Sequence, residues 1–131
     1  MTLSPDLYPQ FLHHGAAGGV TGSCHRYMAD ADTHVLVDCG LFQGSDVTEA
    51  DHHAQHRIGF DISAIRALIV THVHIDHVGR LPYLFAAGFR GPVYCSEPSA
   101  KLLPLVIEDA LKVGFTRDAG LINQFLAAHL R

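Results

Sequence analysis

Short hydrophobic runs alternate with glycine-rich or polar segments along the chain, and the runs have the length of strands. We predict strands at residues 9–13, 23–28, 34–37, 67–70 and 92–95. The run 67–70 is wholly apolar, which is typical of a strand buried on both faces of a layered fold. We interpret 92–95 as another buried strand.

Helical patterns dominate the second half of the chain. We predict a helix over residues 78–87, a second helix that Ser96 caps, and a last helix that begins at Asp118. In the second helix, apolar residues recur at every fourth position over 102–111, and Pro104 should bend it. This alternation of strands and helices predicts an α/β fold.

Two segments connect the first strands. Residues 15–22 should form a tight turn, and residues 41–60 should form a loop with one helical turn. The loop carries histidines that we expect to be exposed to solvent, namely His52, His53 and His56. The histidines on or near the strands should make ordinary hydrogen bonds, and the alternative for His13 or His14 is a place near the functional site: His13, His14, His25 and His34.

Composition narrows the class of protein. The chain has 131 residues, typical of one domain, and its 48% hydrophobic and 17% charged residues exclude a disordered chain. A net charge of −4 excludes a protein that coats polyanions through general attraction. The three cysteines have neither the number nor the spacing of a disulfide framework or a zinc ribbon. Since neither a signal peptide nor an apolar run of bilayer length is visible, we expect a cytoplasmic protein.

Histidine is in excess, with 11 residues, and a cluster of metal-competent side chains directly follows the strand 67–70. His72, His74, Asp76 and His77 carry imidazole and carboxylate groups, which suit zinc, manganese or iron. In extended backbone the first two histidines point the same way and can bind one metal together. A tight turn after this pair would direct the other two ligands toward a second metal. Two metals about 3.5–4 Å apart can share a water and stabilise a phosphate or carbonyl oxygen.

Four segments of the chain resemble the β-CASP branch of the metallo-β-lactamase fold: 15–24 (GAAGGVTGSC), 36–44 (LVDCGLFQG), 71–82 (THVHIDHVGRLP) and 88–94 (GFRGPVY). The metal motif is specific for the superfamily, whereas GLFQG and GRLP are specific for the branch. That branch contains RNA-processing nucleases similar to the cleavage and polyadenylation factor endonuclease and to ribonuclease J. The resemblance implies an α/β chain that forms the N-terminal half of an αββα sandwich.

The resemblance also implies roles for single residues. His72 and His74 would hold the first metal, and Asp76 and His77 the second. Asp76 is also the catalytic candidate, since it would help to orient the attacking water. Asp38 would orient a metal-bound histidine. The alternative is that Asp38 is an ordinary aspartate in the turn at the end of a strand. The cofactors would be two divalent metals, zinc in the first place, with manganese or iron as alternatives.

The function that follows is metal-dependent hydrolysis of RNA phosphodiester bonds in the full-length protein, with RNA as substrate and no membrane partner. Family members continue downstream with further metal ligands and an inserted β-CASP domain. We therefore expect residues 1–131 to be the N-terminal part of the domain, an incomplete sandwich without the insertion. Such a fragment should not cleave RNA alone, and should self-associate or need its C-terminal half. The alternatives are another hydrolase of this fold, such as a thioesterase, and a non-catalytic metal-binding fragment.

Overall fold

The computed structural model describes residues 7–44, 49, 57–114 and 116–130 of the chain. Within this part, the strands form one sheet whose spatial order, β1-β2-β3-β4-β5, is also their order in sequence. The antiparallel pairs are β1–β2 and β2–β3, whereas β3–β4 and β4–β5 are parallel. The strand bounds are β1 (Gln10–Gly15), β2 (Cys24–Met28), β3 (His34–Val37), β4 (Ile65–Ile69) and β5 (Val93–Tyr94).

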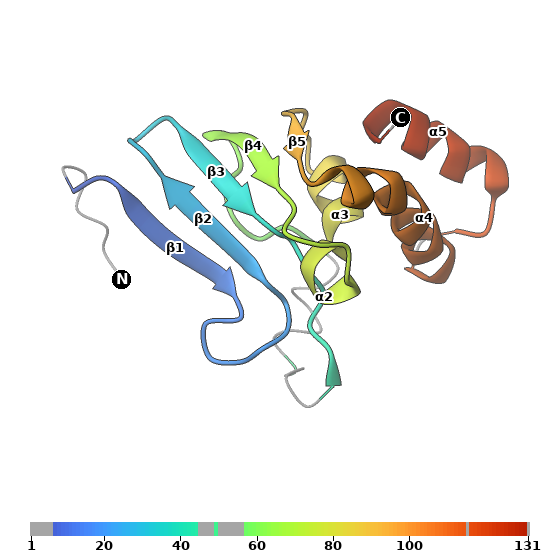
Figure 1. The fold of residues 1–131 in the computed structure, drawn as a ribbon, viewed down its shortest axis with the longest axis horizontal. Helices are drawn as coiled ribbons and strands as arrows, with labels where there is room; N and C mark the ends of the chain where they lie inside the picture. Colours follow the sequence, from blue (N-terminus) through green and yellow to red (C-terminus); the bar gives the residue numbers. More distant parts are fainter. Residues whose placement is uncertain (1–6, 45–48, 50–56, 115, 131) are drawn as a thin grey trace.

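The helices gather at the β5 end of the sheet, and β1 forms the opposite edge (Figure 1). Figure 1 also shows α4 and α5 as neighbours, with α5 outermost. The helix bounds are α2 (Ile75–Val78), α3 (Leu81–Ala86), α4 (Glu97–Gly114) and α5 (Ala119–His129). The predicted α/β class is confirmed, because one sheet of mixed parallel and antiparallel strands packs against helices.

One face of the sheet and the helices share a single hydrophobic core. Leu36 of β3 and Leu68 of β4 are fully buried against side chains from α3 and α4, such as Leu84 and Ile107. Each such side chain contributes about 1.5–3 kcal/mol when it leaves water. This core fixes the ends of β3 and β4, where the candidate site lies.

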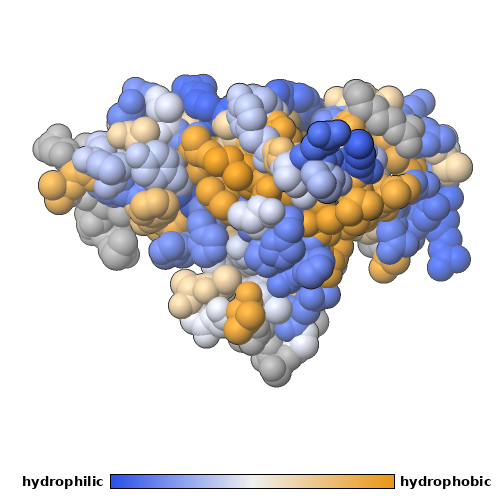
Figure 2. All heavy atoms as spheres, viewed as in Figure 1, coloured by the Kyte–Doolittle hydropathy of each residue, from blue (hydrophilic) through white to orange (hydrophobic). Residues whose placement is uncertain are grey.

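The other face of the sheet is open, so the prediction of strands buried on both faces is wrong. Ile69 of β4 is 40% exposed, and Tyr94 of β5 is 59% exposed. The physical reason is that the described helices cover only the opposite face. Figure 2 shows hydrophobic side chains at the surface over the β3 and β4 region and along α4. Leu105 and Val113 are exposed hydrophobic residues of α4.

The predicted helix over 78–87 is also wrong in its extent, because two short helices replace it. The first, α2, already begins at Ile75, where a tight turn was predicted. The backbone of Arg80, with φ −98° and ψ 6°, interrupts the helical path before α3 begins with a proline in its first turn. The predicted start of the last helix at Asp118 is confirmed, since Asp118 is the N-cap of α5 and its carboxylate accepts hydrogen bonds from two backbone N–H groups of that helix. Pro104 lies inside a continuous α4.

Candidate functional site

Asp38 directly follows β3 and adopts a left-handed backbone conformation, with φ 62°. Aspartate tolerates this region better than most residues, and here the backbone N–H of Asp38 donates to the carbonyl of Ile69 at 2.8 Å. The side chain is buried, with only 2% of its surface exposed. The turn therefore directs a carboxylate inward at the point where β3 and β4 end together.

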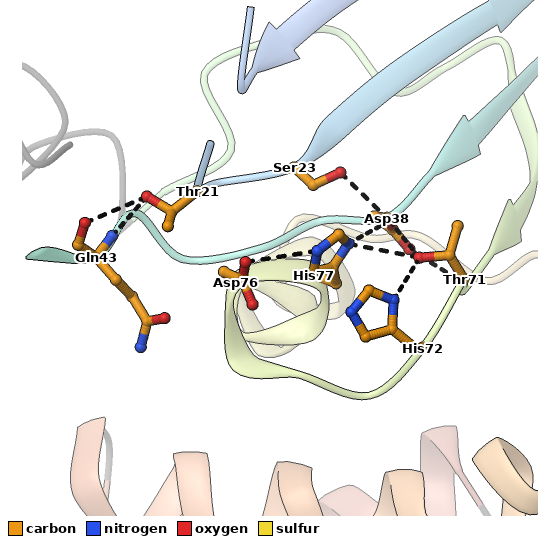
Figure 3. Close-up of polar contacts among 8 residues, drawn as sticks. All are labelled: Thr21, Ser23, Asp38, Gln43, Thr71, His72, Asp76 and His77. Atoms are coloured by element: carbon orange, nitrogen blue, oxygen red, sulfur yellow. Dashed lines mark hydrogen bonds and ion pairs between the residues drawn. The ribbon is translucent and has the colours of Figure 1, made fainter. Parts of the chain in front are cut away.

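Every donor around this buried carboxylate comes from a segment near the end of β4 or the start of β2 (Figure 3). The Thr71 backbone N–H donates to Oδ1 at 2.8 Å, and the Thr71 hydroxyl donates to Oδ2 at 2.7 Å. His77 Nδ1 lies 2.7 Å from Oδ2, and the Ser23 hydroxyl donates to the same oxygen at 3.3 Å. These bonds offset the cost of removing the carboxylate from water.

The helix α2 has only four residues and depends on tertiary hydrogen bonds for its position. The backbone N–H of Cys39 donates to the carbonyl of His77 at 2.8 Å, and that of Ser23 donates to the carbonyl of Asp76 at 2.9 Å. Gly40 makes this close approach possible, because a Cβ atom there would collide with the Asp76 carbonyl. The segment after β3 and Ser23, directly before β2, thus position the two ligand candidates of α2.

The structure brings the four predicted metal ligands together after β4. The ring centroids of His72 and His74 are 4.7 Å apart, and those of His72 and His77 are 3.9 Å apart. Asp76 Oδ2 lies 3.5 Å from His77 Nε2. Among the described residues, however, no three histidine, cysteine, aspartate or glutamate side chains are arranged to hold a single ion. The donors are therefore gathered in one place without converging on one point.

The hydrogen bonds of the cluster leave ring nitrogen atoms available, and such atoms are suitable ligands for a divalent metal. With Asp38 ionised, His77 carries its proton on Nδ1 and keeps the lone pair on Nε2, which faces the Asp76 carboxylate. Thr71 Oγ1 lies 3.1 Å from His72 Nδ1, so the same arrangement is available to that ring. Neutral imidazole nitrogen next to a carboxylate oxygen is a donor set that zinc and its neighbours in the periodic table accept.

Sequence reasoning missed two partners of Asp38, namely Thr71 and Ser23. Thr71 directly precedes the metal motif. Its position between the strand and the first ligand candidates was the only sign in the sequence that it could contact Asp38. Ser23 was predicted only as the first residue of the strand 23–28, directly after the glycine-rich turn.

The histidines of β1, β2 and β3 divide between the two faces of the sheet. His14 accepts a hydrogen bond from Arg26 at 3.2 Å, and burial followed by the Arg26 charge lowers the pKa of His14 to about 4. His34 is buried beside Arg26, whereas His13 and His25 contact each other. The histidines predicted to be exposed, His52, His53 and His56, lie outside the described residues.

Comparison with known proteins gives one family and several relatives. The profile of the Metallo-beta-lactamase superfamily matches residues 19–122. The chain is 52% identical to Ribonuclease TTHA0252 of Thermus thermophilus over 99 residues, which are 76% of this chain and 22% of that protein. It is 39% identical to Transcription termination factor FttA of Methanocaldococcus jannaschii, over 76% of this chain and 15% of that protein. It is also 39% identical to Cleavage and polyadenylation specificity factor subunit 3-II of Arabidopsis thaliana, over 60% of this chain and 13% of that protein.

The chain thus spans about a fifth or less of the length of these relatives, in their N-terminal part. In the part of the chain that the structure describes, no helix has the length and apolar character needed to cross a membrane.

Proposed function

Because the chain belongs to the metallo-beta-lactamase superfamily and its relatives are those of the β-CASP branch, we propose that its cluster after β4 is part of a centre for RNA hydrolysis. Membership of the superfamily implies that a divalent metal binds. The reaction, in the whole protein, is metal-dependent cleavage of RNA phosphodiester bonds. The chain contributes the N-terminal part of the catalytic domain and acts in the cytoplasm.

The observation that carries this proposal is the contact between His77 Nδ1 and Asp38 Oδ2 at 2.7 Å. A buried carboxylate that holds one ring nitrogen fixes the orientation of the imidazole and leaves the other nitrogen for a ligand. In this arrangement His77 and Asp76 would hold one metal, and His72 and His74 would hold the other. Asp76 would also orient the attacking water. Asp38 acts through His77 and does not touch the substrate.

Zinc is the metal that the imidazole-rich donor set favours, with manganese and iron as the other candidates. When bound, two such ions lower the pKa of water and stabilise negative charge on phosphate oxygens. The protein's own contribution is rigidity. The carboxylate of Asp38 and the backbone bonds of α2 hold the side chains in place before a metal arrives.

The first test is metal binding by the chain itself. Calorimetric titration with zinc should detect binding that the His74→Ala and Asp76→Asn variants weaken. Asp30→Asn is the matched control, because Asp30 lies in an exposed turn after β2. Equal affinity of all four proteins would contradict the assignment of the ligands.

The second test concerns RNA. The matched segment of the Thermus thermophilus ribonuclease is replaced by the corresponding segment of this chain, and cleavage of a labelled single-stranded RNA is followed. Cleavage should persist, should stop with a chelator, and should be lost in the His74→Ala chimera but not in the Asp30→Asn chimera. A folded chimera without activity would count against RNA hydrolysis. Residues 1–131 alone should not cleave the RNA.

We also propose that the exposed apolar surfaces make the isolated chain associate with itself or with the missing C-terminal half. Leu105 is 62% exposed and Val113 is 83% exposed on α4, and Ile69 and Tyr94 are exposed on the sheet. Contiguous exposed apolar surface is typical of an interface. Sedimentation over a range of protein concentrations tests this, and a strictly monomeric chain would contradict self-association.

A further inference from the structure

Two histidines lie directly opposite each other on the open face of the sheet, on strands β1 and β2. His13 of β1 pairs with His25 of β2 in the antiparallel register. Phe11 and Tyr27 form the preceding pair on the same face, with ring centroids 5.2 Å apart. Side chains of directly opposed residues are close neighbours, so the register itself brings the two imidazoles together.

The contact between the two imidazoles is made by the same nitrogen of each ring. His13 Nδ1 lies 2.7 Å from His25 Nδ1, and the two ring planes are nearly perpendicular, at 78°. Among the residues that the structure describes, neither ring has another hydrogen-bond partner. The pair therefore presents two ring nitrogens that point toward a common position and are not committed to a carboxylate or a carbonyl.

The protonation of the pair favours ligation. At 2.7 Å, two Nδ1 atoms must share a single proton, because two N–H groups would repel each other. Burial, followed by the neighbouring His13 ring, lowers the pKa of His25 from its ordinary value. Its imidazole is therefore neutral at neutral pH, and neutral imidazole is the form that binds transition metals.

We propose that His13 and His25 form a second, two-histidine site for a divalent transition metal on the open face of the sheet. The metal replaces the shared proton between the two Nδ1 atoms. Ligand nitrogens on a tetrahedral zinc ion lie about 3.3 Å apart, since each sits about 2.05 Å from the metal. The present separation of 2.7 Å must therefore open by a few tenths of an ångström. His13 is exposed to solvent, so a small rotation of its side chain can supply this change.

The donors define the class of ion. Two imidazole nitrogens select zinc, nickel or copper(II), whereas magnesium and calcium prefer oxygen ligands. Water must complete the coordination, because the described residues supply no third ligand at this site. The site should accordingly be weaker than a structural zinc site and should exchange its metal readily.

Nuclear magnetic resonance of the histidine side chains tests the proposal residue by residue. The uniformly 15N-labelled chain is titrated with zinc, and the ring signals are assigned from His13→Gln and His25→Gln. The Nδ1 signals of both residues should shift together with one apparent Kd. Each variant should weaken the response of the remaining ring at least about tenfold, because a chelate becomes a single contact. Magnesium should shift neither signal.

Two controls separate this site from its surroundings. His14→Gln alters the next residue of β1, which bonds to Arg26 on the other face of the sheet, and should leave the paired response unchanged. His74→Ala should also leave it unchanged, so a failure of the proposed catalytic centre would not affect this result. The proposal is overturned if the two rings respond with different Kd values, if either glutamine variant leaves the remaining ring's Kd unchanged, or if magnesium gives the same shifts.

Discussion

His77 and Asp38 are 39 residues apart in sequence, yet His77 Nδ1 lies 2.7 Å from Asp38 Oδ2. The carboxylate is buried at the end of β3, and the imidazole belongs to the first turns after β4. Because β3 and β4 are parallel neighbours, their carboxyl ends meet at the same edge of the sheet. This contact joins the two halves of the candidate site.

Replacing Asp38 by asparagine should weaken zinc binding about 10–100-fold, the usual effect of removing a group that orients a metal ligand. An amide has the shape of the carboxylate but lacks its charge and offers N–H donors, so it cannot hold His77 with the proton on Nδ1 in the same way. Calorimetric titration measures the change. Asp30→Asn, in an exposed turn, should bind zinc like the unchanged chain. Equal zinc affinity of the two variants would contradict the role assigned to Asp38.

The Thr71 hydroxyl should contribute to stability through Asp38. Thr71→Val keeps the shape of the side chain but removes the donor at 2.7 Å from Asp38 Oδ2. The free energy of unfolding should fall by about 1–3 kcal/mol, because a buried carboxylate loses one of its hydrogen bonds. Urea denaturation measures this quantity. Thr71→Ser keeps the hydroxyl and should recover most of the loss; no difference between valine and serine would argue against the hydrogen bond.

A methyl group at Gly40 should disturb both the fold and the site. In Gly40→Ala, the new Cβ would collide with the backbone carbonyl of Asp76, which cannot move without displacing α2. We expect a loss of at least about 1–3 kcal/mol in the free energy of unfolding, together with weaker zinc binding. Gly59→Ala is the matched control, since a Cβ there meets nothing within 4 Å. Similar stability of the two alanine variants would show that α2 tolerates displacement.

His14 should make stability depend on pH. Its pKa is about 4 in the folded chain against 6.5 ordinarily, so within this interval the unfolded chain binds a proton that the folded chain does not. The free energy of unfolding should therefore have its full value above pH 6.5 and should decrease as the pH falls toward about 4. Urea denaturation across this interval should give a shallower decrease for His14→Gln, which keeps an acceptor for Arg26. Parallel curves for both proteins would contradict the lowered pKa.

Local patterns in the sequence were sufficient for most of the fold. The bounds of β3 at 34–37 and the start of the last helix at Asp118 were predicted correctly, because hydrophobic runs and helix starts depend on neighbouring residues. The cluster from His72 to His77 was visible as a motif after a strand, and the family resemblance implied that Asp38 orients a histidine. Whether these side chains bind metal stays a prediction.

Only the tertiary structure decided how distant segments meet. Strand register determines three of these contacts. They are the collision that excludes a side chain at Gly40, the two hydrogen bonds from Thr71 to Asp38, and the pairing of His13 with His25. The exposure of Ile69 had the same origin, since an apolar run cannot indicate which of its faces the helices cover. Composition and spacing determine which elements form, whereas register and packing, which act between residues far apart in sequence, determine which side chains they bring together.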